Sequence, residues 1–233
     1  IWKEYTSVLG FVKPGASTTD KYKIELYVFY QSDWKAEGSG VDATIGLLNV
    51  NPWAISSRGG QTVAHEVGHT FQYLVSCDLG QLHGFNYGYG DNASGGNGWW
   101  ESCANWQAYK CYPSMQFSDG ENFEGHLKLH HLNLLHEDWR YQNCFIQDYW
   151  CMMHGQDFIG RLWREATKPE DPVEAYQRMN KLTQEQFNDE QYMGYARMAT
   201  WDIDGVRDYA KSRIGSHETH LHKAAANDGT WEV

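Results

Sequence analysis

Residues 62–71 of this 233-residue chain read Thr62-Val63-Ala64-His65-Glu66-Val67-Gly68-His69-Thr70-Phe71. Apolar residues recur in and after this segment at intervals of three or four positions, which is the period of a helix with one buried face. They are Val63, Val67, Phe71 and Leu74. The sequence therefore predicts an amphipathic helix that begins near Gln61.

Within this segment, His65 and His69 flank Glu66 in an H-E-x-x-H pattern. Residues four positions apart lie on the same face of a helix, about 5–6 Å from each other. Both imidazoles can therefore reach one zinc ion, and Glu66 would lie where it can deprotonate a zinc-bound water. The pattern predicts zinc ligands at His65 and His69 and a catalytic base at Glu66. The alternative is a pair of surface histidines on an amphipathic helix.

A catalytic zinc usually takes three protein ligands and keeps one position open. Glu101 is the best candidate for the third, because it opens the next predicted helix, beyond a glycine-rich loop at 80–98. Asn105 follows one turn later on the same face, where its side-chain oxygen can fix the second ring nitrogen of a ligand histidine. The small Ala104 and Ala108 would let this helix approach the first closely. Alternatively, Glu101 is an acidic residue that complements a helix N-terminus.

H-E-V-G-H followed by a Glu that opens an E-x-x-A-N helix resembles the gluzincin clan of zinc metallopeptidases, which includes thermolysin and zinc aminopeptidases. The run W-W-E-S-x-A-N-W is also similar to poorly characterised bacterial secreted proteins. The likeness covers residues 44–110 and implies hydrolysis of peptide bonds by a metal-activated water. It assigns His65, His69 and Glu101 to the metal. Thermolysin-like enzymes carry Asp where this chain has Asn105, and no G-x-M-E-N sequence precedes the helix.

Members of this clan usually stabilise the tetrahedral intermediate with a Tyr or His from the helical half of the fold. The segment 140–149 resembles the Y-x-x-x-x-F helix that carries the catalytic Tyr in aminopeptidase relatives. The resemblance therefore nominates Tyr141, with His136 and His154 as further candidates. A buried core tyrosine with a bonded hydroxyl is the alternative explanation for Tyr141.

Two segments rich in β-branched and aromatic residues, 22–30 and 44–50, are predicted strands, with a glycine-containing turn at 37–40 between them. We expect 44–50 to be the edge strand that pairs with an extended peptide substrate. Beyond Trp99 the pattern is almost wholly helical. The predicted helices are 100–109, 123–140, 141–154, 156–166, one that begins at Pro172 and one that follows a capping box at 183–186.

This layout predicts an α+β fold that is zincin-like, with a small N-terminal sheet, the active-site helix and a mostly helical C-terminal part. We expect an α+β subdomain at 1–110 and a helical subdomain at 111–233. Together they would form one catalytic unit within a longer protein.

The composition supports a packed core, because 41% of the residues are hydrophobic and 21% are charged. The net charge of −11 argues against nucleic acid or an anionic membrane as the main partner, and no apolar run is long enough to span a bilayer. We expect a monomer that acts on a peptide or glycoprotein substrate. The resemblance implies a secreted, periplasmic or cell-surface location. Cys144 and Cys151 lie too far apart on one predicted helix to form a disulfide.

Two other functions remain open from the sequence. A degenerate peptidase domain could bind peptide or glycan through its glycine-rich loop and tryptophan-rich flanks, whereas a structural zinc domain is disfavoured because closed sites prefer four Cys or His ligands. The weaker signals favour structural roles. They are a solvated histidine face at 126–131, core tryptophans at Trp99, Trp100 and Trp106, a short acidic turn at 202–205 and surface histidines at 217–222.

Overall fold

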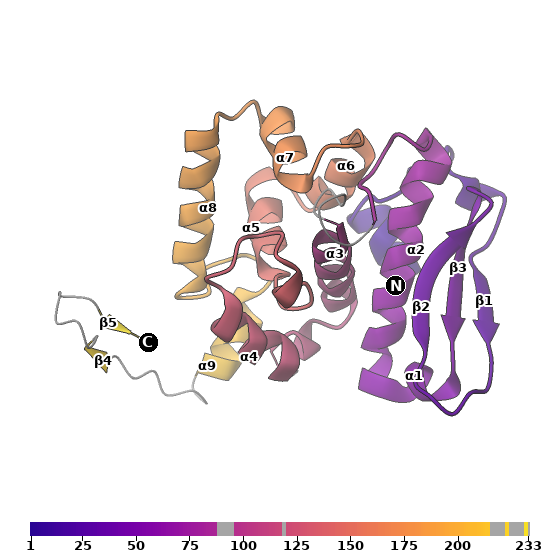
Figure 1. Ribbon diagram of the computed structural model, residues 1–233, viewed down its shortest axis with the longest axis horizontal. Coiled ribbons are helices and arrows are strands. Elements are labelled where there is room, and N and C mark those ends of the chain that lie inside the picture. The colour runs from indigo at the N-terminus through magenta and orange to yellow at the C-terminus, as the bar shows by residue number, and fades with distance from the viewer. Residues whose placement is uncertain (88–95, 118–119, 215–221, 224–230, 233) are drawn as a thin grey trace.

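The computed structural model describes residues 1–87, 96–117, 120–214, 222–223 and 231–232. A small sheet forms one side of the molecule, and helices make up most of the remainder (Figure 1). The predicted α+β class is therefore confirmed. None of the described helices is long and apolar enough to cross a membrane.

The sheet has three strands, β1 (Glu25–Val28), β2 (Ala36–Val41) and β3 (Ile45–Val50), in the order β1-β3-β2. β3 runs parallel to β1 and antiparallel to β2. The prediction that 44–50 is an edge strand is wrong, because β3 is central and buries every second residue. The edges of the sheet are β1 and β2.

The segment 37–40 was predicted as a turn because of its glycines, and this prediction is also wrong. Gly38 and Gly40 belong to β2, where they allow the strand to lie directly against a helix. A Cβ atom at Gly38 would lie 1.9 Å from the carbonyl oxygen of Glu66, and one at Gly40 would lie 1.9 Å from the ring of Tyr73. A glycine inside a strand often marks such a close approach.

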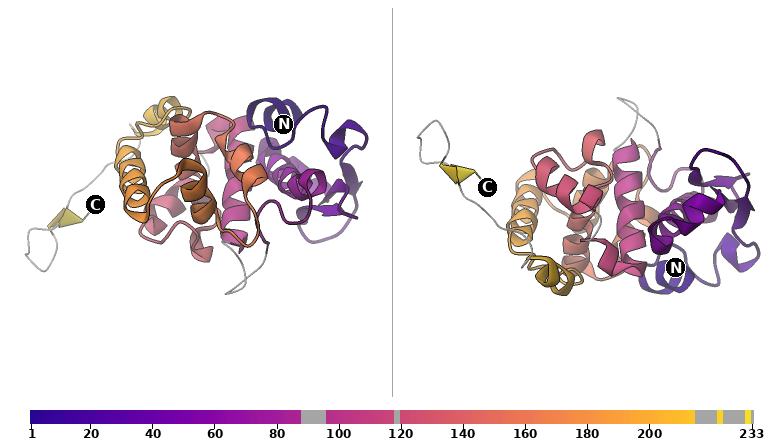
Figure 2. Two further views of the ribbon diagram at one scale, coloured as in Figure 1. Left: turned by 90° about the horizontal axis from the view of Figure 1, so that it is seen from above. Right: turned by 90° about the horizontal axis from the view of Figure 1, so that it is seen from below.

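Two long helices follow the sheet. After α1 (Pro52–Ser56), α2 (Gln61–Leu79) packs against β2 and β3, and α3 (Gly96–Cys111) packs along α2 away from the sheet (Figures 1 and 2). The helices predicted from Gln61 and at 100–109 are confirmed, and the second begins earlier than expected. Residues 88–95 of the predicted loop lie outside the described residues.

The remaining helices cover the other side of α3. The capping box predicted at 183–186 is present at Thr183, and Asp171 forms another before Pro172. The histidine cluster at 217–221 lies outside the described residues. The elements are α4 (Gly120–Leu129), α5 (Phe145–His154), α6 (Phe158–Glu165), α7 (Pro172–Asn180), α8 (Gln184–Met198), α9 (Arg207–Ile214), β4 (His222–Lys223) and β5 (Trp231–Glu232).

The predicted helices at 123–140 and 141–154 are each shorter than expected, because the chain between α4 and α5 forms turns. The side-chain oxygen of Asn133 accepts a hydrogen bond from the Leu135 amide at 3.0 Å, and Asn143 donates to the Leu134 carbonyl. Such side-chain bonds to the backbone compete with helix formation. Tyr141 consequently lies in a turn before α5 rather than on a helix.

The hydrophobic core runs through most of the described chain, from Tyr5 to Ala210. Trp99 and Trp106 are fully buried in it, as predicted, whereas Trp100 is only partly buried. All five cysteines are free.

His126 does not belong to a solvated face, contrary to the sequence-based expectation. Its side chain is 4% exposed, contacts the rings of Trp139 and Phe145, and has Nδ1 3.2 Å from the carbonyl oxygen of Gln142. Burial lowers the pKa of His126 to about 4, because the protonated ring would lose its hydration.

Replacing Gly38 with Ala is expected to lower the free energy of unfolding by about 1–3 kcal/mol, because the methyl group must push β2 away from the backbone of α2. Chemical denaturation measures this change. The neighbouring Ser39→Ala is the matched control, with an expected change within about 0.5 kcal/mol. Equal stability of the two variants would contradict the close contact between β2 and α2.

The stability of the protein is expected to depend on the protonation of His126. The unfolded chain takes up a proton near pH 6.5 but the folded chain only near pH 4, so stability is complete above pH 6.5 and falls as the pH drops through this window. The loss attributable to this ring is up to about 3 kcal/mol. Denaturation at several pH values should show a flatter profile for His126→Gln than for the exposed control His130→Gln, and identical profiles would refute the assignment.

Candidate metal centre

The site is built where α2 and α3 touch. A Cβ atom at Gly68 of α2 would lie 3.3 Å from the Cα of Ala104 and 2.8 Å from Oε1 of Gln107 on α3, so a larger residue would separate the helices. Ala104 and Ala108 are fully buried in this interface, as expected from their size. The close packing allows a side chain from the first turns of α3 to meet the histidines of α2.

Three side chains converge at this contact. Oε2 of Glu101 lies 3.0 Å from Nε2 of His65 and 3.2 Å from Nε2 of His69, and the two nitrogens are 3.2 Å apart. Among the described residues, this is the one group of three or more His, Cys, Asp or Glu side chains spaced to hold a metal ion. The structure thus brings together the three residues that the sequence nominated as ligands.

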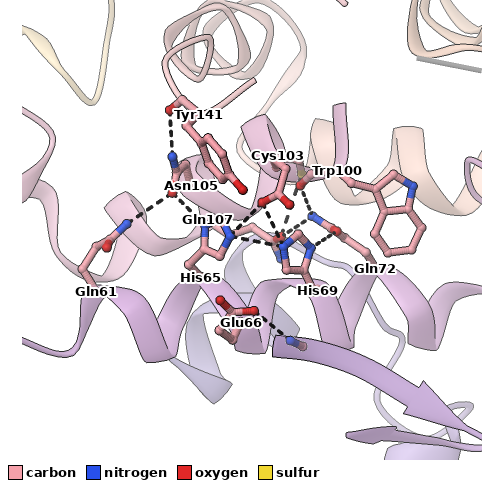
Figure 3. A network of polar contacts seen from close by, with 12 residues as sticks. Gln61, His65, Glu66, His69, Gln72, Trp100, Cys103, Asn105, Gln107 and Tyr141 are labelled. Carbon is pink, nitrogen blue, oxygen red and sulfur yellow. Dashed lines mark hydrogen bonds and ion pairs between the residues drawn. The ribbon is translucent and has the colours of Figure 1, made fainter. Parts of the chain in front are cut away.

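Asn105 fixes the ring of His65. The amide nitrogen of Asn105 lies 2.7 Å from the carbonyl oxygen of Tyr141, which can only accept a hydrogen bond. The oxygen Oδ1 therefore faces Nδ1 of His65, at 2.7 Å (Figure 3). Nδ1 must carry the proton, which leaves a lone pair on Nε2.

Gln72 fixes the ring of His69 in the same way, and the sequence analysis missed it. Its amide nitrogen donates to the carbonyl oxygen of Trp100 at 3.1 Å, so its oxygen faces Nδ1 of His69 at 2.9 Å. The signal was present in the sequence, since Gln72 lies three positions after His69 and hence on the same helix face. The proton on Nδ1 again leaves Nε2 bare.

When both rings are neutral, two bare nitrogens and a carboxylate oxygen point at one another, and a positive charge among them, from a metal ion or from a proton on one ring, relieves their repulsion. Burial alone would raise the pKa of Glu101, but hydrogen bonds and charge interactions with the histidines outweigh it and hold the pKa well below its usual value. A tetrahedral zinc with bonds of about 2.0–2.1 Å separates its ligand atoms by about 3.3 Å. The observed separations of 3.0 and 3.2 Å fit this ion.

Glu66 lies on the side of α2 that faces the sheet. Its Oε2 accepts a hydrogen bond from the amide of Gly38 on β2 at 2.7 Å (Figure 3). The side chain is buried, so this bond fixes one carboxylate oxygen in place. The backbone amide can reach Glu66 because Gly38 has no Cβ.

Tyr141 is brought to the same site from the turn before α5. Its ring centroid lies 6.2 Å from that of His65, and the guanidinium of Arg140 lies 5.1 Å from the Tyr141 ring centroid. Burial and the negative charge of Glu101 raise the pKa of Tyr141 above its usual value. The other two candidates do not line this site, because His136 caps a short turn and His154 is hydrogen-bonded to Tyr176.

A cleft of about 810 Å³ lies over these residues. Residues of α2, β2, α3 and the Tyr141 turn line it. His65, Glu66, His69, Glu101 and Tyr141 all line it. The cleft is wide enough for a ligand larger than a water molecule to reach the metal-binding atoms.

A family model described as a family of unknown function (DUF6055) matches residues 1–233, and the chain belongs to that family. Searches of curated proteins and of solved structures found no match.

The purified protein is expected to contain about one equivalent of zinc, and His69→Ala none, because two ligands cannot complete the site. The exposed His130→Ala is the matched control and should keep its zinc. Gln72→Leu should bind zinc about 10–100-fold more weakly, since it removes the acceptor that holds the His69 ring. Elemental analysis and competition with a chelator measure these values, and a zinc-free wild-type protein after zinc loading would disprove the site.

Proposed function

We propose that this member of the family is a zinc-dependent metallopeptidase that hydrolyses peptide bonds with a metal-activated water. The observation that carries the proposal is the orientation of the two histidines, because Asn105 and Gln72 hold Nδ1 of each ring and direct both Nε2 atoms toward Glu101. A structural zinc site would be closed by four ligands, whereas the described residues supply three, in an open cleft.

Zinc held by His65, His69 and Glu101 would supply an acidified water and polarise the carbonyl of the scissile bond. Glu66 lies in the same cleft and offers its second oxygen, Oε1, to the attacking water, since Oε2 is held by Gly38. In this assignment Glu66 takes the proton of the water and later passes it to the leaving amine. Because the Glu66 side chain is buried, few bulk water molecules compete for hydrogen bonds to its carboxylate.

Tyr141 is the proposed donor to the oxyanion. Its raised pKa keeps the hydroxyl protonated at neutral pH, so it can donate a hydrogen bond to the developing negative charge. The cationic Arg140 beside the ring adds a positive potential on that side of the cleft.

The edge strand β2 is the proposed docking surface for an extended peptide, in place of the segment 44–50 that the sequence suggested. β2 pairs with β3 on one side only, and residues 36–39 line the cleft. A peptide laid along this edge would pass over the metal centre and could pair with backbone groups of the strand other than the Gly38 amide, which Glu66 already binds. A secreted, periplasmic or cell-surface location remains part of the proposal, from the resemblance in the sequence.

Replacing Glu66 with Gln is expected to keep the fold and the zinc but to reduce peptide hydrolysis by about 10²–10⁴-fold, since an amide cannot accept the proton of the water. Gln retains an oxygen that can accept the hydrogen bond from Gly38. Cleavage of a denatured protein substrate, followed by mass spectrometry, measures the activity. The exposed Glu185→Gln is the matched control and should be as active as the wild type.

Full activity of the Glu66→Gln variant would overturn the assignment of the base. Binding of peptides by both wild type and variant, with cleavage by neither, would instead support a degenerate domain that acts as a binding module.

A further inference from the structure

Two exposed tryptophans lie in the cleft rather than in the hydrophobic core. Most described tryptophans are buried, but Trp34 is 45% exposed and Trp53 is 59% exposed. Both line the cleft that contains the metal centre. An exposed indole leaves a large apolar face in water, and such faces mark ligand-binding surfaces when they gather in a cleft.

The two indoles are carried by segments that are hydrogen-bonded to each other. Asn51, which follows β3, is held by two hydrogen bonds. Its backbone amide donates to the Lys35 carbonyl at 3.0 Å, and its side-chain amide donates to the Asp33 carbonyl at 2.7 Å. These bonds join the segment that carries Trp34 to the residue that precedes α1, which carries Trp53. The segments that carry the two indoles are therefore fixed to each other, and both indoles line the cleft that contains the metal centre.

The exposed indoles of Trp34 and Trp53 favour a ligand that contains a neutral ring with one apolar face. An apolar side chain is best bound in a closed pocket, whereas these half-exposed indoles form an open platform that covers only one face of a ligand. A pyranose suits this arrangement because its C–H face can lie on an indole while its hydroxyls stay in water. Next to Trp34 in the sequence, Lys35 pairs with Glu37 at 2.6 Å.

Two amide side chains line the same cleft. Gln61 and Gln142 carry groups of the kind that exchange hydrogen bonds with hydroxyls. A surface with stacking rings and neutral amides recognises a sugar by its shape and hydroxyls rather than by charge.

We propose that the part of the cleft lined by Trp34 and Trp53 binds a neutral sugar ring carried by the substrate, so that the substrate class is a glycosylated peptide. The inference rests on the proposed function, because it places the sugar on the peptide that the metal centre would cleave. The sugar would hold the peptide along β2 while the indoles set which bond lies over the metal.

The test uses the full chain with Glu66→Gln, so that bound peptides stay intact. The probes are one Ala/Gly/Ser peptide and the same peptide with a single glucose, N-acetylglucosamine or N-acetylgalactosamine on its serine. Calorimetry should show that at least one glycosylated form binds about tenfold or more tightly than the bare peptide. Adding Trp34→Ala or Trp53→Ala should reduce this advantage about tenfold, whereas Tyr192→Ala, an exposed aromatic outside the cleft, should not.

Equal affinity for the bare peptide and every glycosylated form would overturn the inference, and so would an absence of binding by all of them. A preference for the same peptide with Phe in place of its serine over all sugars would assign the platform to an aromatic side chain instead and also overturn it. These outcomes are separate from the proposed function, which is tested by cleavage with Glu66 intact. A chain that prefers the glycopeptide but never cleaves would keep the sugar site and refute the peptidase.

Discussion

Two side-chain amides determine the chemistry of the site by fixing which nitrogen of each histidine carries a proton. Asn105 is oriented by the carbonyl of Tyr141 and Gln72 by that of Trp100, so neither amide can turn without losing a backbone hydrogen bond. Both histidines therefore direct Nε2 toward Glu101, and each neutral ring presents a lone pair there. The cluster is buried, and three acceptors in a low-dielectric environment repel one another unless a cation lies between them.

Close packing of α2 against α3 and against the sheet keeps the groups of the site within reach of one another. α2 contacts α3 at Gly68 on one face and contacts β2 at Gly38 on the other. The first contact brings Glu101 to the histidines, and the second brings a backbone amide to Glu66. A side chain at either glycine would widen one of these interfaces and separate groups that must remain within hydrogen-bond distance. Glycines at the two interfaces of α2, Gly68 in the helix and Gly38 in β2, thus position the ligands and the base.

Aromatic residues have two separate roles in the molecule. The buried tryptophans, such as Trp106, Trp150 and Trp163, fill the core that supports α2 and α3. Trp100 links the core to the site, because its ring stacks near His69 and its carbonyl orients Gln72. Trp34 and Trp53 lie in the cleft and leave their faces in water. The amino-acid composition gives only the total number of aromatic residues. The burial of each one distinguishes those that stabilise the fold from those available to a ligand.

The sequence alone determined the helix that carries His65, Glu66 and His69 and the α+β class, because helical periodicity is a local property. It nominated Glu101 and Asn105 from the pattern that follows H-E-x-x-H, and the tertiary structure brings them to the histidines. It did not determine β2, since the glycines at positions 38 and 40 are equally typical of turns and their purpose is a contact with a helix that follows later in the chain. Nor did it reveal the central position of β3, the acceptor Gln72 or the turn that carries Tyr141. These features depend on which backbone groups meet after folding, and only the tertiary structure decides that.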